Sequence, residues 1–143
     1  MKVGFIGLGN VGGKLCGSLL RNGFDLTVRD LDKSIAQPFL DKGAHWADSP
    51  KEMAENVDMI ITCLPSPAAS AAVMEAEDGI LAGIKPGGIW AEMSTTDEAE
   101  VRRLGALVKE KGAEPIDCPV SGGCHRAATG NISIFAGCER SSL

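Results

Sequence analysis

A glycine-rich hexapeptide near the N-terminus constrains the fold of this chain more than any other feature. Residues 3–6 before it are an apolar run, and residues 13–21 after it carry leucines on one helical face. Residues 26–28 then resemble a second strand, and Asp30 lies 18 residues after Gly12. Strand, glycine turn, helix, strand and an acid about 20 residues on is typical of a dinucleotide-binding unit. The hexapeptide consists of Gly7, Leu8, Gly9, Asn10, Val11 and Gly12.

Each residue type in this unit has a physical task. Gly7 permits the tight turn out of the strand, Gly9 lets the backbone approach a pyrophosphate, and Gly12 lets the helix pack closely on the strand. The first N–H groups of the helix and its positive dipole end favour phosphate. Asp30 is the expected acceptor for the hydroxyl groups of the adenosine ribose. The alternative is a glycine-rich turn that binds nothing, which the flanking pattern disfavours.

Strand-like and helix-like segments alternate along the rest of the chain. This alternation predicts an α/β fold with a doubly wound, mostly parallel sheet of the Rossmann type, in three layers. Pro38 is expected to kink or break a helix over residues 33–42, and Thr96 is expected to cap a later helix. The length fits one domain, residues 1–143. Further strands are expected over 44–47, 58–64, 89–93, 115–118 and, as a sheet edge, 132–136; further helices are expected from 49 and over 68–76.

Composition and charge exclude several classes of partner. With a net charge of −5 and no basic patch, nucleic acid and anionic membranes are not expected partners. No apolar run approaches the roughly 18 residues that span a bilayer, and a strand that begins at Val3 leaves no room for a signal peptide. The five cysteines are odd in number and include no C-x-x-C pair, so neither a disulfide framework nor a metal site is expected. These features predict a reduced, cytoplasmic protein.

Glycine-rich or polar loops follow several of the predicted strands. In open parallel sheets, ligands bind outside the carboxyl ends of the strands. The loops are therefore expected to meet at one edge of the sheet and to form a binding site there. They are Gly7–Gly12, Asp30, Leu64–Ser66, Ser94–Thr96 and Pro119–Gly123.

The last of these loops carries a family resemblance. Residues 117–123, with Ala127 and Gly130, resemble the D-x-P-V-S-G-G-x-x-x-A-x-x-G substrate signature of the β-hydroxyacid dehydrogenases. This family includes 3-hydroxyisobutyrate dehydrogenase, tartronate semialdehyde reductase and 6-phosphogluconate dehydrogenase. Residues 3–12, Leu64-Pro65 and Met93–Thr95 are similar to the same family, in the same order. The resemblance implies the cofactor domain of an NAD(P)-dependent oxidoreductase that acts on a small β-hydroxy acid.

The resemblance also implies a role for each cofactor loop. The Gly7–Gly12 loop would hold the pyrophosphate, and Asp30 would hold the adenosine ribose. Leu64 and Pro65 would line the nicotinamide-ribose side of the site. Thr95 would contact the nicotinamide half of the cofactor.

The substrate would lie at the signature loop. The resemblance assigns its carboxylate to Ser121, Gly122 and Gly123. Oriented N–H groups in a glycine-rich turn form an anion-binding concavity, so this role is chemically reasonable. A plain tight turn is the alternative.

The acid at position 30 also indicates which nicotinamide cofactor to expect. Asp30 places a negative charge where the 2′-phosphate of NADP would lie, and Leu31 supplies no compensating arginine. We therefore expect NAD rather than NADP. Arg29 complicates this prediction, because its side chain could turn toward the phosphate.

The chain departs from the family pattern in four respects. Val11 stands where a methionine is common, and Ala69 stands where a cofactor-binding asparagine is common. The catalytic lysine of the family, followed by an asparagine, would come after the cofactor domain, but the last lysine here is Lys111. The helical domain of the family is likewise expected to be absent. We therefore expect a domain cut near its C-terminal end that has no catalytic residue, is inactive alone and forms a homo-oligomer through bared apolar surface.

Three alternatives remain open. One is a non-enzymatic nucleotide-binding module, either a sensor or an interaction domain. A second is a flavin or adenosylmethionine domain, which Ser121-Gly122-Gly123 disfavours. The third is His125 as a substitute acid or base, with an exposed loop histidine as the simpler interpretation.

Overall fold

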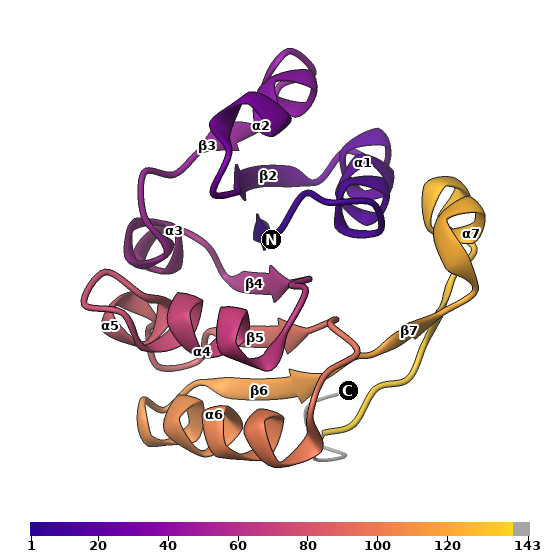
Figure 1. Cartoon of the computed structure of the whole chain (residues 1–143). Helices are drawn as coiled ribbons and strands as arrows, with labels where there is room; N and C mark the ends of the chain where they lie inside the picture. The colour runs from indigo at the N-terminus through magenta and orange to yellow at the C-terminus, as the bar shows by residue number, and fades with distance from the viewer. Residues whose placement is uncertain (139–143) are drawn as a thin grey trace.

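The computed structural model describes residues 1–138, and a six-stranded sheet forms its centre (Figure 1). The strands lie in the order β3-β2-β1-β4-β5-β6, and each neighbouring pair is parallel. The order reverses between β1 and β4, which is where an open sheet of this kind forms its ligand crevice. The predicted doubly wound sheet is therefore confirmed. The strands are β1 (Lys2–Ile6), β2 (Asp25–Arg29), β3 (His45–Trp46), β4 (Met59–Thr62), β5 (Ile89–Glu92) and β6 (Glu114–Asp117).

Helices cover both faces of the sheet, which gives the three predicted layers. Because successive side chains of a strand alternate between the faces, neighbouring residues belong to different cores. Phe5 and Ile61 lie in the core under α1 and α2, whereas Ile60 and Trp90 lie in the core under α3 to α6. The helices are α1 (Gly12–Arg21), α2 (Lys33–Leu40), α3 (Pro50–Asn56), α4 (Pro67–Glu75), α5 (Ile80–Gly83), α6 (Glu98–Glu110) and α7 (Gly123–Thr129).

Side-chain caps set the starts of α3 and α6, two of the helices on the second face. Ser49 Oγ accepts a hydrogen bond from the Glu52 N–H at 3.0 Å, which confirms the start signal predicted for α3. The prediction that Thr96 caps α6 is wrong. Asp97 is the cap, and its Oδ1 accepts a hydrogen bond from the Glu100 N–H at 3.0 Å. A carboxylate at this position also complements the positive end of the helix dipole, which a neutral hydroxyl does not.

The expected break at Pro38 is absent, because α2 is one continuous helix from Lys33 to Leu40. Its start is capped by Asp32, whose Oδ1 accepts a hydrogen bond from the Ser34 N–H at 2.9 Å. A proline removes one backbone donor, and so close to the end of a short helix this costs a single i→i−4 bond. The helix ends at Leu40, two residues earlier than predicted.

A strand forms within residues 132–136 as predicted, but it is shorter and does not join the main parallel sheet. Instead, β7 (Val120–Ser121) and β8 (Ser133–Ile134) pair antiparallel in a separate two-stranded sheet. Gly137 returns to the main sheet, through an antiparallel bridge to Asp117 at the end of β6.

Helix α7, which the sequence analysis missed, explains this departure. It lies between β7 and β8 and carries the chain away from the sheet, toward α1 (Figure 1). Ala127 of α7 is fully buried, and the Arg21 guanidinium at the end of α1 donates a hydrogen bond to the Ala128 carbonyl oxygen. Gly122 before α7 and Gly123 at its start favour a loop in any sequence-based interpretation, which is why this helix was not predicted.

Candidate functional site

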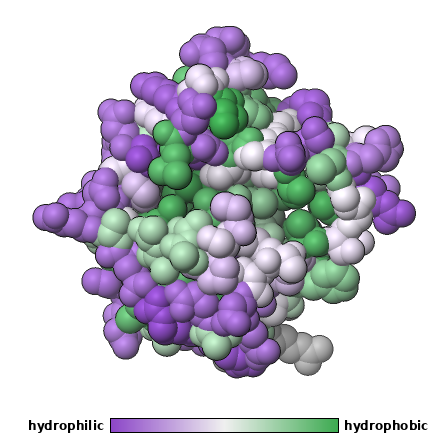
Figure 2. All heavy atoms as spheres, in the orientation of Figure 1, coloured by the Kyte–Doolittle hydropathy of each residue, from purple (hydrophilic) through white to green (hydrophobic). Residues whose placement is uncertain are grey.

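A cleft of about 790 Å³ opens at the carboxyl ends of the strands, where the strand order reverses. Apolar side chains gather around the hollow in the middle of the face shown in Figure 2. The cleft joins all five predicted loops, so the expected convergence is confirmed. Among the predicted site residues, those that line it are Gly7, Gly9, Asn10, Val11, Gly12, Asp30, Leu64, Pro65, Thr95 and Gly123.

The three glycines of the first loop have different surroundings. Gly7 has a φ of +98°, and a Cβ there would overlap the Cys63 carbonyl oxygen. A Cβ on Gly12 would overlap the Gly7 carbonyl oxygen, because the start of α1 packs tightly against the end of β1. A Cβ on Gly9 would meet no atom within 4 Å. The fold therefore requires Gly7 and Gly12, whereas the space beside Gly9 is open to the cleft.

Asp30 ties the glycine loop to β2. Its Oδ2 accepts a hydrogen bond from the Leu8 N–H at 2.7 Å, and its Oδ1 accepts one from the Asp32 N–H at 3.2 Å. The Leu8 side chain is buried in the core and points away from the cleft. Leu8 thus contributes its backbone to the loop, while Asp30 both braces the loop and lines the cleft.

The two cations near Asp30 have partners elsewhere. Arg29 Nη1 donates hydrogen bonds to the carbonyl oxygens of Ala47 at 3.1 Å and Asp48 at 2.6 Å. The Arg29 guanidinium also lies 5.7 Å from the centroid of the Trp46 ring, and Lys33 Nζ lies 5.0 Å from the same centroid. Their charges are therefore held toward β3 rather than beside the Asp30 carboxylate.

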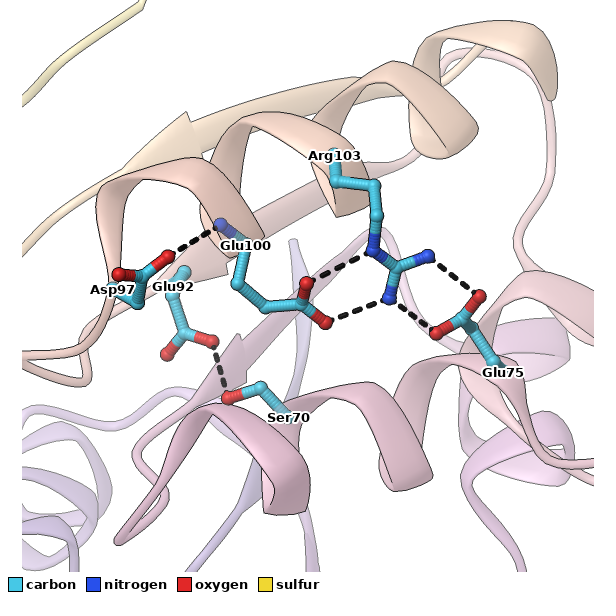
Figure 3. Close-up of polar contacts among 6 residues, drawn as sticks. All are labelled: Ser70, Glu75, Glu92, Asp97, Glu100 and Arg103. Carbon is cyan, nitrogen blue, oxygen red and sulfur yellow. Dashed lines mark hydrogen bonds and ion pairs between the residues drawn. The ribbon is translucent and has the colours of Figure 1, made fainter.

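Hydrogen bonds to a buried glutamate join the loops on the other side of the cleft. Glu92, at the end of β5, has no exposed surface. Its Oε1 accepts hydrogen bonds from the Ser94 N–H at 2.8 Å and from the Ser94 hydroxyl. Its Oε2 accepts one from the Ser70 hydroxyl at 3.0 Å (Figure 3). Ser94 Oγ in turn accepts a hydrogen bond from the Leu64 N–H at 2.7 Å. The sequence analysis missed Glu92, although a charged residue within the apolar segment 89–93 was a usable signal.

Burial dominates the electrostatics on this side. It raises the pKa of Glu92, although the hydrogen bonds from Ser94, Ser70 and Thr62 act in the opposite direction. Burial, with a smaller contribution from the Glu92 charge, raises the pKa of the Cys63 thiol to about 11. Cys63 lines the cleft but is therefore a neutral thiol at neutral pH, which does not suit it to act as a nucleophile.

The signature loop, Pro119–Gly123, contains β7, Gly122 and the first residue of α7. Gly122 and Gly123 both have positive φ angles, +130° and +74°. Gly123 lines the cleft, whereas Ser121 is exposed in β7, and His125 is exposed on α7. Across residues 1–138, no three His, Cys, Asp or Glu side chains are grouped so that they could hold a metal ion. No helix among these residues is long and apolar enough to cross a membrane.

Known proteins resemble this chain over nearly all of its length. It is 38% identical over 135 residues to "3-hydroxyisobutyrate dehydrogenase, mitochondrial" of Mus musculus, which covers 94% of this chain and 40% of the mouse protein. A solved structure of Mycobacterium tuberculosis 3-hydroxyisobutyrate dehydrogenase with L-serine is 27% identical, with a TM-score of 0.90, and the match covers 99% of this chain and 48% of that one. The structure of Psf3 in complex with NADP+ and 2-OPP is 30% identical, with a TM-score of 0.93, and the match covers 98% and 50%.

The chain thus spans only 40% to 42% of the length of the curated relatives from Mus musculus and Dictyostelium discoideum. Residues 2–143 match the family described as the NAD binding domain of 6-phosphogluconate dehydrogenase. The match to this family and to 3-hydroxyisobutyrate dehydrogenases confirms the resemblance that the sequence motifs indicated. The chain belongs to the β-hydroxyacid dehydrogenase family, as its NAD-binding domain.

Proposed function

We propose that the cleft binds NAD and that the chain supplies the cofactor site of a dehydrogenase of small β-hydroxy acids. The observation that carries this proposal is the contrast among the three glycines of the first loop. The fold leaves no room for a side chain at Gly7 or Gly12, yet it leaves open space at Gly9. The packing of the fold would tolerate a side chain at position 9. The glycine found there is therefore explained better by the close approach of a pyrophosphate to the backbone.

The proposed cofactor contacts follow the order of the loops along the cleft. The Gly7–Gly12 loop and the start of α1 would hold the pyrophosphate, since no side chain caps that helix start. Asp30 would accept hydrogen bonds from the adenosine ribose, while Leu64, Pro65 and Thr95 would enclose the nicotinamide half. When bound, NAD accepts or donates hydride, and the residues of this chain bind and orient it.

We further propose NAD rather than NADP as the preferred cofactor. Asp30 presents a carboxylate at the end of β2, where a 2′-phosphate would suffer charge repulsion. Arg29 and Lys33 are held toward Trp46 and the carbonyl oxygens after β3. To pair with the 2′-phosphate of NADP, Arg29 or Lys33 would therefore have to give up contacts that it already makes.

The proposed substrate is a small β-hydroxy acid, as the names of the relatives suggest. Its carboxylate would be bound by the turn Ser121–Gly123, where two consecutive positive φ angles orient the backbone N–H groups. Since the chain spans two fifths of its curated relatives, the dehydrogenase activity is proposed for a protein of their length.

The proposed location is a compartment that keeps thiols reduced. Within residues 1–138 all five cysteines are free, and three of them have raised thiol pKa values. The cytoplasm satisfies this condition, and so does the mitochondrion, which appears in the names of several relatives. Fractionation of cells that express the full-length protein would distinguish the two.

We also propose that copies of the chain associate. Ile134 is 49% exposed and Phe135 62% exposed, next to the ends of the short β7–β8 sheet. Exposed apolar side chains beside open strand edges favour pairing with another chain. Light scattering after size exclusion should give a mass above that of the monomer, and a monomer at every concentration would contradict this.

Calorimetric titration of NAD into three forms of the chain tests the proposed cofactor site. We expect Gly9→Val to abolish binding, because two methyl groups would occupy the place of the pyrophosphate, while its circular dichroism stays native. Gly17→Ala on α1 is the matched control: its Cβ would make only ordinary contacts, the nearest at 3.5 Å to Arg21, so NAD affinity should not change. Near wild-type affinity in a natively folded Gly9→Val variant would refute the phosphate loop.

A further inference from the structure

Glu92 is unusual because it is a fully buried carboxyl group at the carboxyl end of β5, one strand in from the β6 edge of the sheet. Charged side chains are rarely buried completely unless hydrogen bonds and partners compensate the loss of water. Here no cation is among its hydrogen-bond partners within residues 1–138; they are the N–H and hydroxyl of Ser94 and the hydroxyls of Ser70 and Thr62. A carboxylate is a pure acceptor, so it can orient all these donors at once.

The donors that Glu92 orients belong to the elements that enclose one end of the cleft. Ser94 follows β5 and precedes Thr95, and both line the cleft. Ser70 lies in the first half of α4, next to Ala69, which also lines the cleft. Glu92 therefore fixes the loop after β5 relative to α4 without reaching the cleft itself.

Ser94 extends this control to the loop after β4. Its hydroxyl hydrogen is donated to Glu92, so the oxygen lone pairs face the Leu64 N–H, which donates to it at 2.7 Å. Without Glu92 the serine hydroxyl can rotate, and the Leu64 N–H loses an acceptor of fixed direction. One buried carboxyl group thus sets the positions of Leu64 and Thr95, which lie on the neighbouring loops after β4 and β5 and both line the cleft.

We propose that Glu92 is a positioning residue for the nicotinamide half of the cofactor, acting through Ser94 on the loops that carry Leu64 and Thr95. This inference rests on the proposed NAD site and adds to it a residue that does not touch the ligand. The glycine loop and Asp30 do not hydrogen-bond to Glu92, so binding of the adenosine diphosphate half should not depend on it.

A second anchor on α4 provides the control. Arg103 of α6 makes a two-pronged pair with Glu75 at the end of α4, at 2.9 and 2.6 Å, and also pairs with Glu100 (Figure 3). This pair holds the same helix at its far end but contacts neither Ser94 nor Leu64. An Arg103 variant therefore shows how ligand binding responds when α4 loses a contact that does not involve Ser94 or Leu64.

The experiment compares dissociation constants for NAD and for ADP, which lacks the nicotinamide and the ribose attached to it. They are measured by calorimetry in the wild-type chain, Glu92→Gln, Ser94→Ala and Arg103→Met. We expect Glu92→Gln and Ser94→Ala to weaken NAD about tenfold, the effect of about one lost polar interaction, and to change ADP by less than about twofold. Arg103→Met should leave the ratio of the two constants unchanged while lowering the melting temperature.

Each outcome decides a different point. An unchanged ratio in folded Glu92→Gln and Ser94→Ala overturns the inference. So does equal affinity of the wild type for NAD and ADP, although the cofactor site itself would then stand. A wild type that binds neither ligand overturns the proposed function instead. Should Glu92→Gln fail to fold, Ser94→Ala and Ser70→Ala decide the matter, because each removes one hydroxyl and leaves the carboxylate its remaining donors.

Discussion

The two sides of the cleft are built by different means. On the side of β1 and β2, the backbone defines the site: glycines bring α1 close to β1, and one partly buried acid braces the loop. On the side of β4 and β5, a buried carboxyl group and three hydroxyl-bearing side chains define the loops. The first side depends on glycines, which have no side chain. The second side depends on hydrogen bonds between polar side chains that are buried away from water. Mutations should therefore act on the two sides in different ways.

The largest effect is expected from Gly12→Ala, on the backbone-built side. Its Cβ would overlap the Gly7 carbonyl oxygen, so α1 would have to move from β1 and stability should fall by at least about 3 kcal/mol. Gly9→Ala has open space and should change stability by less than about 0.5 kcal/mol while weakening NAD binding. Urea unfolding of both variants measures this, and equal stabilities would mean that the tight packing at Gly12 has no energetic weight.

The backbone-built side could be predicted from the sequence because it requires particular residue types at particular positions. Gly7, Gly9 and Gly12 have the spacing of a dinucleotide-binding motif, and Asp30 follows at the expected separation in the sequence. The alternation of strands and helices likewise predicted the parallel, doubly wound sheet of the main fold. These are local signals, since each depends on residues close in the chain or on the regular period of an element.

The side-chain network escaped the sequence analysis because its partners lie far apart in the chain. Ser70 and Glu92 are 22 positions apart, and Leu64 and Ser94 are 30 positions apart. No spacing rule links them until the sheet has formed. The misplacement of residues 132–136 has a related cause: their β-like composition was clear, but the packing of α7 on α1, which decides their partner, is a tertiary contact.

The next effect in size concerns the choice of cofactor. NAD should bind about tenfold to a hundredfold more tightly than NADP, which corresponds to one charge repulsion of about 1–3 kcal/mol. Asp30→Asn should narrow this gap, because the amide keeps an oxygen for the Leu8 N–H while removing the charge. Parallel titrations with both cofactors test it. Wild-type binding of NADP as tight as that of NAD would remove Asp30 from its proposed role.

A third prediction compares Glu92→Gln with the wild type as a function of pH. Burial raises the pKa of Glu92 in the folded chain above the usual value of 4.5, so the folded state holds this proton more tightly than the unfolded state. Wild-type stability is then lost as the pH rises from 4.5 through the raised pKa, and the variant lacks this loss. Melting temperatures across that range should rise for Glu92→Gln relative to the wild type. A constant difference would mean that Glu92 does not titrate differently in the two states.

The smallest effect is expected at the exposed ion pair between Arg103 and Glu75, which joins α6 to the C-terminal end of α4. Hydrogen bonds from Arg103 lower the pKa of both Glu75 and Glu100, so the stability they contribute is present above the usual value of 4.5 and is lost as the pH falls below it. Arg103→Met should therefore lower the melting temperature by a few degrees at about pH 7 and by less at about pH 3. Arg102→Met is the matched control, since Arg102 pairs at 2.9 Å with Glu98 on its own helix and does not bridge to α4. Equal shifts for the two variants at both pH values would show that the bridge adds nothing to the pairing within one helix.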